Sequence, residues 1–278
     1  WLSREDVASP TAATESVLLT AAIDAMEGRD VMTSDIPNAF IQAEMPQTND
    51  GIEKVIMKIT GPLVELLIDI NPNLYGPMVV YEKGRRVIYV WVLRAIYGML
   101  IAALLWYKKF KLKLEGVGFI FNPYDPCVAN RTIKNNLQTI IFHVDDIKSS
   151  HVDEKVNTEF EKWLNTEFGK HGKVTTRRGK SHDYLGMTLD YNTKGEVKID
   201  MQKYVLDMLN DFPIKFKEDQ VATSPAGDKA FIGGVGKLLD KNRSELFHTF
   251  VAKGLFLCKR ARPDIQQAIA ILTTRVKA

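Results

Sequence analysis

The spacing of apolar residues predicts amphipathic helices in several parts of the chain. Apolar positions recur at helical spacing over Thr14–Met26 and over Asp153–Phe168, which is typical of helices that bury one face. Gly98–Leu114 is more apolar and is predicted to form a buried helix that becomes basic toward its end. Further helices are predicted over residues 61–70, 202–211, 245–257 and 263–275.

Strands are predicted where β-branched and aromatic residues lie between turn signals. Val31–Asp35 is one of them, and it must end there because Pro37 cannot donate to a ladder. Pro37 instead suits the first position of a helical turn that reaches Gln42. Lys83–Gly84 is predicted to form the turn of a hairpin. The other strands are predicted over residues 53–59, 78–92, 127–131, 138–143, 147–149, 183–191 and 197–200.

The order of these elements predicts an α+β fold. Helices and strands are mixed in the first part of the chain, and helices alone follow. Residues 222–236 are rich in Gly, Pro and Ala and are predicted to link the two parts. The sequence contains no internal repeat and no low-complexity tract.

Composition and charge add little to this picture. The 278 residues are 45% hydrophobic and 26% charged, with a formal net charge of +3, as in ordinary globular proteins. Basic residues are concentrated over 170–180 and 253–262, where they could hold phosphates. Taken alone, either cluster is better explained as a solvated helix or loop surface.

Disulfide, zinc and membrane signals are weak. Cys127 and Cys258 lie far apart, and the five histidines have no metal-binding spacing, so neither a disulfide framework nor a zinc site is expected. Val87–Trp106 is almost long enough to span a membrane, but it contains Arg94 and begins with a strand-like run. We therefore expect a soluble, intracellular protein with no membrane partner.

Asp145 and Asp146 interrupt an apolar stretch, and they are the first candidates for chemistry. Adjacent carboxylates repel each other unless a cation compensates them, although Asp is also a favoured turn residue. Asp35 changes this balance because it ends another predicted strand. If the two strands are neighbours in one antiparallel sheet, three carboxylates meet there. Such oxygen ligands select Mg²⁺ or Mn²⁺, and two ions about 4 Å apart support in-line phosphoryl transfer.

Six sequence landmarks resemble those of Copia-type LTR retrotransposon reverse transcriptases. SDIPNAF at 34–40 resembles the first polymerase motif of that family, and FHVDD at 142–146 stands where the family has Tyr-Val-Asp-Asp. The landmarks follow the family's order over nearly the whole chain. The others are RAIYGM…LWYKKF at 94–110, Phe119…Asp125-Pro126-Cys127, DYLG at 183–186 and ARPDI at 261–265.

The resemblance implies a right-hand polymerase fold, with an antiparallel-sheet palm, partial fingers and a helical thumb. It places palm, with the N-terminal part of the fingers truncated, at 1–42, fingers at 43–100, palm at 101–200 and thumb at 201–278. The implied activity is that of an RNA-directed DNA polymerase from a Pol polyprotein, located in a cytoplasmic virus-like particle in the parent element.

The resemblance also implies roles for individual residues. Asp35, Asp145 and Asp146 are the expected catalytic and metal-binding residues, and the backbone carbonyl of Ile36 completes the ligands of two Mg²⁺ ions. Phe40 is expected beneath the incoming sugar, where a bulky ring excludes a 2′-hydroxyl; a plain core Phe is the alternative. The other expected nucleotide-binding residues are Ala39, Tyr97 and Gly98, and those for primer and template are His143, Lys253, Lys259, Arg260 and Arg262.

The implied partners are an RNA or DNA template-primer, deoxynucleoside triphosphates, and the protease, integrase and RNase H domains of the parent polyprotein. Two departures from the family pattern are His143 in place of Tyr and Leu100–Ile101 in place of Lys-Gln. Because the family's upstream finger strands have no counterpart in this sequence, a catalytically inactive or domesticated nucleic-acid-binding remnant is the main alternative. A palm-fold nucleotidyl cyclase is disfavoured by the basic tail.

Overall fold

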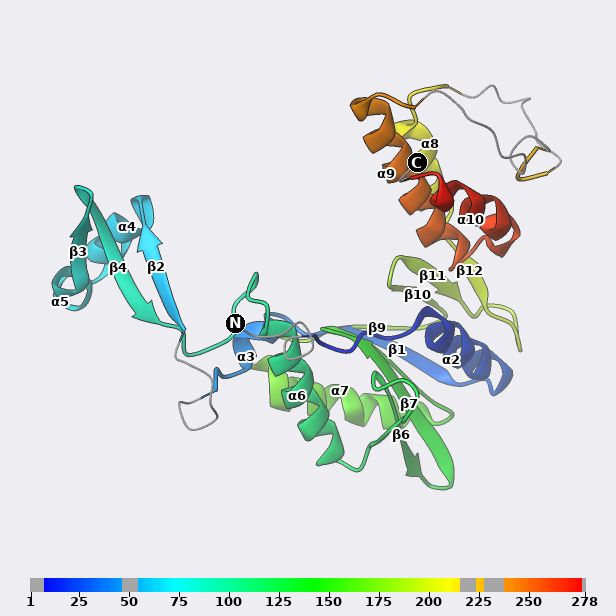
Figure 1. Ribbon diagram of the computed structural model, residues 1–278. Coiled ribbons are helices and arrows are strands. Elements are labelled where there is room, and N and C mark those ends of the chain that lie inside the picture. Colours follow the sequence, from blue (N-terminus) through cyan, green and yellow to red (C-terminus); the bar gives the residue numbers. More distant parts are fainter. Residues whose placement is uncertain (1–7, 47–54, 216–223, 228–237, 277–278) are drawn as a thin grey trace. The chain divides into compact units, whose positions relative to one another are not determined.

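The computed structural model of the protein describes residues 8–46, 55–215, 224–227 and 238–276 (Figure 1). The chain divides into two units. The first comprises residues 1–10, 36–119 and 165–173, and the second comprises residues 11–35, 120–164 and 174–278. Helices and antiparallel sheets together make the fold α+β, as the order of predicted elements indicates.

The second unit is built on a six-stranded sheet. Its order is β5–β6–β7–β8–β1–β9, and each neighbouring pair is antiparallel. β1 lies between β8 and β9, so the sheet joins segments that are far apart in the sequence. The strands are β1 (Asp30–Asp35), β5 (Ile120–Phe121), β6 (Val128–Ile133), β7 (Asn136–His143), β8 (Asp146–His151) and β9 (Thr175–Arg178).

Helices pack on this sheet. α2 (Thr14–Met26) contributes Val17 to the same buried cluster as Val31 of β1. α7 (Glu154–Phe168) contributes a fully buried Asn157, whose amide nitrogen donates to oxygens of β1. The sheet is therefore anchored by apolar contacts to one helix and by a buried amide to the other.

Charged residues in the core of the second unit are paired. Lys148 on β8 and Asp24 on α2 form an ion pair whose side chains are 1% and 0% exposed. Arg29 lies 4.0 Å from Asp24 and donates a hydrogen bond of 2.9 Å to Thr139. Because an unpaired buried charge is strongly destabilising, this network holds α2 on the sheet.

A three-stranded sheet and three helices complete the second unit. The sheet has the order β10–β11–β12. Tyr184, Met187 and Leu257 join its strands and α9 to the cluster that contains α2. The elements are β10 (Ser181–Tyr184), β11 (Met187–Asp190), β12 (Lys198–Asp200), α8 (Gln202–Asp211), α9 (Lys241–Cys258), a 3₁₀ turn (Pro263–Ile265) and α10 (Gln266–Thr274).

The first unit contains another three-stranded antiparallel sheet, of order β2–β4–β3, with α4 packed against it (Figure 1). Elsewhere in this unit, the rings of Trp106 and Phe110 lie 5.4 and 5.6 Å from the ring of Phe168. The elements are α3 (Ala39–Gln42), β2 (Ile56–Thr60), α4 (Pro62–Ile70), α5 (Pro72–Tyr75), a 3₁₀ turn (Gly76–Met78), β3 (Val79–Glu82), β4 (Arg85–Trp91), α6 (Ala102–Glu115) and a 3₁₀ turn (Gly169–His171).

Most predicted elements are confirmed, and several differences from the prediction have local reasons. The helix predicted from Gly98 begins at Ala102, because Gly98 has φ 90° and cannot be helical. The strand predicted over 183–191 is divided into β10 and β11 by a turn at Leu185–Gly186, where both residues have positive φ. Pro37 precedes α3 rather than starting it, since Asn38 caps that helix in the left-handed conformation.

Two edge strands, β5 and β9, were not predicted, and β9 lies within the basic cluster of residues 170–180. Glu53 and Lys54 of the predicted strand 53–59, and most of the predicted linker 222–236, lie outside the described residues. Among the residues that are described, no helix is long and apolar enough to cross a membrane.

Candidate active site

Two of the three predicted carboxylates are direct cross-strand partners. Asp35 is the last residue of β1 and Asp146 is the first residue of β8, and the two pair in register. Because cross-strand partners project from the same face, their side chains are neighbours. His143 and Thr175 continue this row onto β7 and β9. The predicted pairing of the two strands is thus confirmed.

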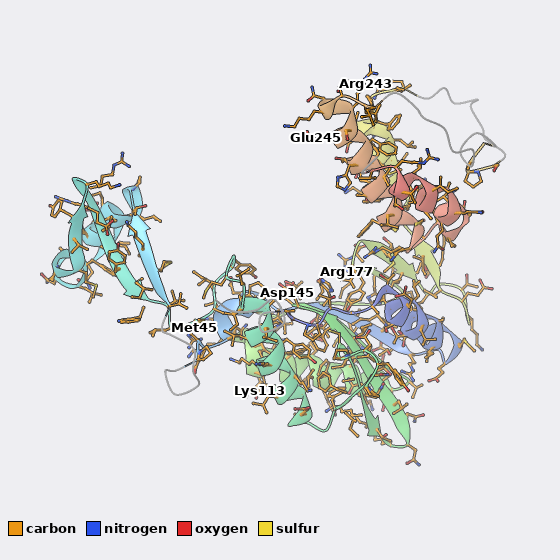
Figure 2. All side chains as sticks on the ribbon, viewed as in Figure 1. Met45, Lys113, Asp145, Arg177, Arg243 and Glu245 are labelled. Atoms are coloured by element: carbon orange, nitrogen blue, oxygen red, sulfur yellow. The ribbon has the colours of Figure 1, made fainter. Side chains whose placement is uncertain are left out.

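Asp145 lies in the turn that precedes Asp146 (Figure 2). His143 and Asp146 are paired, so Val144 and Asp145 form a two-residue turn between β7 and β8. Val144 has φ 61°, which is costly for a β-branched side chain. The tandem acids are therefore held by a tight turn whose backbone is strained.

Asp35, Asp145 and Asp146 form no ion pair with Lys, Arg or His in the described ranges. Burial, followed by the negative charges of Asp145 and Asp35, raises the pKa of Asp146. Burial also raises the pKa of Asp145, with Asp35 adding to the effect and a backbone hydrogen bond opposing it. A positive charge on His143 would lower the pKa of both. A bound cation would relieve the same repulsion.

The donor set has the chemistry that hard divalent cations require. Carboxylate oxygens are the preferred ligands of Mg²⁺, and the mutual repulsion of the acids favours added positive charge. Within the described ranges, however, no group of three or more His, Cys, Asp or Glu side chains is arranged so that it could hold a metal ion. Ile36, the fourth expected ligand, is a buried residue assigned to the first unit.

A hollow of about 120 Å³ adjoins Asp35 and Asp146 and contains residues that sequence reasoning did not assign to the site. Arg177 of β9 lines it, and its Nη1 lies 2.6 Å from Oδ2 of Asp183. Hydrogen bonds from Thr188 and then Arg177 lower the pKa of Asp183. Arg177 stands in the basic cluster and Asp183 in the DYLG landmark, and the pairing of β1 with β9 is what brings Arg177 to this hollow.

The four expected nucleotide-binding residues lie in the first unit. The rings of Phe40 and Tyr97 are 4.6 Å apart and tilted by 52°, and Ala39 is fully buried. Gly98 adopts φ 90°, which a residue with a side chain rarely adopts. Phe40 and Tyr97 therefore form one aromatic pair, and their role in nucleotide binding stays a prediction.

The expected primer and template residues lie in the second unit, and several have internal partners. Lys253 pairs with Asp211 at 2.7 Å, and Arg262 makes two hydrogen bonds to Asp264. The guanidinium of Arg260 lies 3.6 Å from the centre of the Phe256 ring. Lys259, the other lysine of this group, is exposed.

His143 and Arg260 line one cavity of about 250 Å³. Each contributes a buried nitrogen, Nδ1 of His143 and Nε of Arg260, that has no hydrogen-bond partner among the described residues. Buried donors and acceptors are normally satisfied, so these two nearly inaccessible nitrogens are exceptions beside the cavity.

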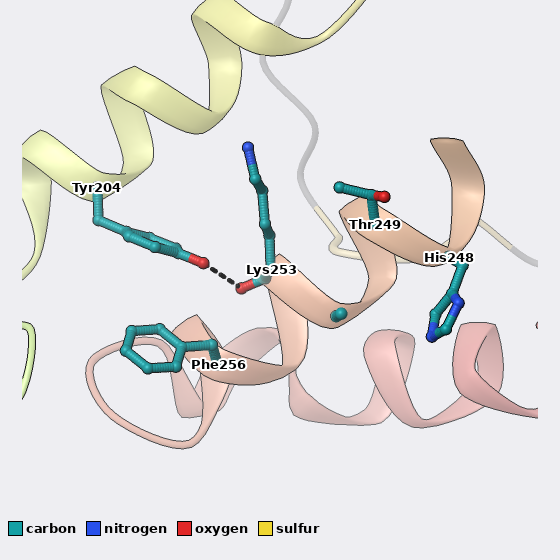
Figure 3. Close-up of a pocket in the computed structure, with 6 residues that line it drawn as sticks. Tyr204, His248, Thr249, Lys253 and Phe256 are labelled. Atoms are coloured by element: carbon teal, nitrogen blue, oxygen red, sulfur yellow. Dashed lines mark hydrogen bonds between the residues drawn. The ribbon is translucent and has the colours of Figure 1, made fainter. Parts of the chain in front are cut away.

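A separate groove of about 490 Å³ lies between α8 and α9 (Figure 3). It is lined by Tyr204, His248 and Lys253 among others, and the Tyr204 hydroxyl donates to the carbonyl oxygen of Lys253 at 3.3 Å. The groove therefore includes one of the expected primer and template residues, Lys253.

No family model matches the chain, and no curated protein matches it. Among solved structures, the apo telomerase of Candida tropicalis, truncated from its C-terminal domain, is 12% identical with a TM-score of 0.34; the match covers 68% of this chain and 40% of that one. The telomerase of Candida albicans, in complex with a TWJ fragment of telomeric RNA, is 11% identical with a TM-score of 0.36; the match covers 95% of this chain and 43% of that one. The matches span less than half of either telomerase chain.

Proposed function

We propose that this chain is the polymerase part of a Copia-type reverse transcriptase, which extends a primer on an RNA or DNA template. The observation that supports this most is the cross-strand pairing of Asp35 with Asp146, beside Asp145 in the adjoining turn. Burial, with a contribution from neighbouring acids, raises the pKa of both tandem acids, so a bound cation would favour their charged forms. In this proposal the six-stranded sheet is the palm, β2–β4–β3 belongs to the fingers and α8–α10 form the thumb.

Asp35, Asp145 and Asp146, with the carbonyl of Ile36, would hold two Mg²⁺ ions, although Mn²⁺ has the same ligand chemistry. When bound, the ions activate the primer hydroxyl and neutralise the leaving pyrophosphate. The strand ends hold the acids on one face, and the tight turn fixes the spacing of the tandem pair. The protein thus supplies position and negative charge rather than a covalent step.

Phe40 would select the sugar of the incoming nucleotide. Its ring packs against Tyr97, so it cannot easily move aside for a 2′-hydroxyl. We expect Phe40→Ala to incorporate ribonucleotides, measured by primer extension with ribonucleoside triphosphates alone. If sugar selectivity is unchanged in that variant, Phe40 is a core residue.

Primer and template would be held by His143 and by the basic residues of α9 and the segment after it. His143 and Arg260 line one cavity, and each has a buried nitrogen without a hydrogen-bond partner among the described residues, which supports a role beside the primer end. Lys253, Lys259 and Arg262 would contact phosphates without reading sequence, so their contribution should weaken with salt.

A second candidate function is a nucleic-acid-binding remnant without activity. Two observations favour it: the absence, among described residues, of a side-chain group arranged to hold a metal ion, and the internal ion pairs of Lys253 and Arg262. This protein would bind template-primer but would not extend it.

Primer extension with Mg²⁺ separates the two functions. Loss of metal-held charge is worth several kcal/mol in the transition state, so Asp146→Asn should slow extension about a thousandfold while template-primer binding survives. Asp207→Asn, an exposed acid on α8, makes the same change away from the site and should leave extension unchanged. Equal rates in the parent and in Asp146→Asn would refute the polymerase.

A further inference from the structure

A cleft of about 1210 Å³ lies in the first unit, where the proposed catalytic steps assign no role. It is bordered by Thr60–Pro62, between β2 and α4, and by residues 81–87 around the β3–β4 turn. Small-molecule sites usually measure roughly 300–1,000 Å³. A cleft above that range suits an extended ligand better than a small metabolite.

The cleft carries more positive charge than its own residues neutralise. Lys58 is paired with Glu82, and Arg86 is paired with Glu65 at 2.9 Å. Lys83 and Arg85 also line it, are exposed, and form no ion pair with any residue of the described ranges. Two cations are thus available to an anionic ligand at the rim.

Exposed tyrosine rings lie beside the two paired cations, Arg86 and Lys58, and one of these rings, that of Tyr81, lines the cleft. Tyr81 is 68% exposed and lines the cleft, and its hydrogen bond to Arg86 is the main cause of the raised pKa of that guanidinium. Tyr89 is 43% exposed, and the ammonium of Lys58 lies 5.8 Å from the centre of its ring. Proteins that bind single strands combine such rings, on which bases stack, with cations that follow the phosphates.

We propose that this cleft binds the backbone of a single-stranded nucleic acid, as a contact separate from the carboxylate site. The choice of nucleic acid as the ligand rests on the proposed function, and the cleft adds where one unpaired strand is held. An acidic protein segment would meet the same cations, but it would gain less from the exposed rings.

The test removes the two unpaired cations while preserving the turn. Lys83 has φ 48° and Gly84 has φ 75°, and Asn-Gly is a preferred pair for such a turn, so Lys83→Asn should fold well. The variant is Lys83→Asn/Arg85→Gln in the full chain. The matched control is Lys194→Asn/Lys198→Gln, which removes the same charge near another Lys-Gly turn, between β11 and β12.

Binding of a fluorescein-labelled single-stranded RNA is measured by anisotropy over a range of salt concentrations. The cleft variant should lose about tenfold in affinity at low salt, and the slope of log affinity against log salt should decrease by about 1.4, as for two lost phosphate contacts. The control should keep both values. Far-ultraviolet circular dichroism checks that both variants are folded.

An unchanged slope in the cleft variant, or an equal decrease in the control, overturns the proposal. So does a loss of affinity for polyglutamate that matches the loss for RNA, because the cleft would then belong to an acidic protein partner. Primer extension by the parent protein tests the proposed polymerase function separately from RNA binding at the cleft. A reduced slope without any extension would support the cleft and refute the polymerase, whereas extension with unchanged RNA affinity would refute the cleft alone.

Discussion

Lys148 and Asp146 lie two residues apart on the same face of β8, yet their charges have opposite surroundings. Lys148 is 1% exposed and paired with Asp24 of α2. Asp146 is half-buried, faces Asp35 across the ladder, and has its pKa raised by burial and by the neighbouring acids. The charge of Lys148 is neutralised inside the protein, whereas Asp146 lies beside two further acids, Asp35 and Asp145.

This difference shows that the missing compensation at Asp146 is local. The same sheet pairs a buried cation with a buried acid under α2, so the fold can neutralise charge where the core requires it. Where β1 ends and β8 begins, the sheet instead brings acids together at a place open to solvent, since Asp35 is exposed. Such a place is suited to a cation from solution.

The largest change in stability is expected from removing Lys148, the ion-pair partner of Asp24. Lys148→Met leaves Asp24 buried with only Arg29 nearby, at 4.0 Å. Removing one partner of a buried pair costs about 3–5 kcal/mol. We expect the free energy of unfolding, measured by urea denaturation, to fall by that amount.

The double variant Asp24→Leu/Lys148→Met serves as the control for this change. Replacing both partners by apolar groups should recover most of the loss, because no uncompensated charge remains. A double variant as unstable as the single one would mean that shape, and not charge, dominates at this position.

A smaller change in stability is expected when a cation binds at Asp35 and Asp146. A cation that binds only the folded protein stabilises it by about 2.7 kcal/mol at a hundred times its dissociation constant. For a chain of this size that corresponds to a rise in Tm of about 5–10 °C. We expect Mg²⁺ to produce this rise in the parent, measured by thermal unfolding at constant ionic strength.

In Asp35→Asn/Asp146→Asn the Mg²⁺-dependent rise in Tm should disappear. Sodium at equal ionic strength should not replace Mg²⁺, because screening alone does not supply a bound charge. A rise of the same size in the double variant would place the cation elsewhere in the molecule.

The placement of the acids at strand ends was predictable from the sequence. Asp35 ends an apolar run before a proline, and Asp145–Asp146 interrupts another, so both were expected at strand ends. That the two strands are antiparallel neighbours was a condition of the hypothesis, and the structure meets it. Their register could not be anticipated from alternating burial, because β1 and β8 are buried at consecutive positions and so on both faces.

Other parts of the site could not be predicted from the same patterns. Arg177 lines the same hollow as Asp35 and Asp146 because β9, a four-residue edge strand inside a run of charges, pairs with β1. Hydrophobic periodicity does not report such a strand, since its burial pattern contains no fully buried position. The cleft at Lys83 and Arg85 was missed for a related reason: sequence alone does not tell which cations are already paired.

The smallest expected effect is the pH dependence of stability that Asp145 and Asp146 contribute. Because folding raises the pKa of Asp145 and Asp146, the folded protein binds protons more tightly than the unfolded chain does. The free energy of unfolding contributed by these acids should therefore fall as pH rises above about 3.8, their ordinary value. Both side chains are partly exposed and screened, so the change should stay below about 1 kcal/mol.

Other acids, such as Asp183, have a lowered pKa and give the opposite slope, so the measurement must be a difference. The stability of Asp145→Asn/Asp146→Asn minus that of the parent should increase from pH 4 to pH 6 without divalent cations, measured by urea denaturation. Saturating Mg²⁺ should remove the increase, because a bound cation lowers the pKa of both acids in the parent. If the difference stays constant over this range in the absence of Mg²⁺, the acids do not repel one another in the folded protein, and Asp146 is as well compensated as Lys148.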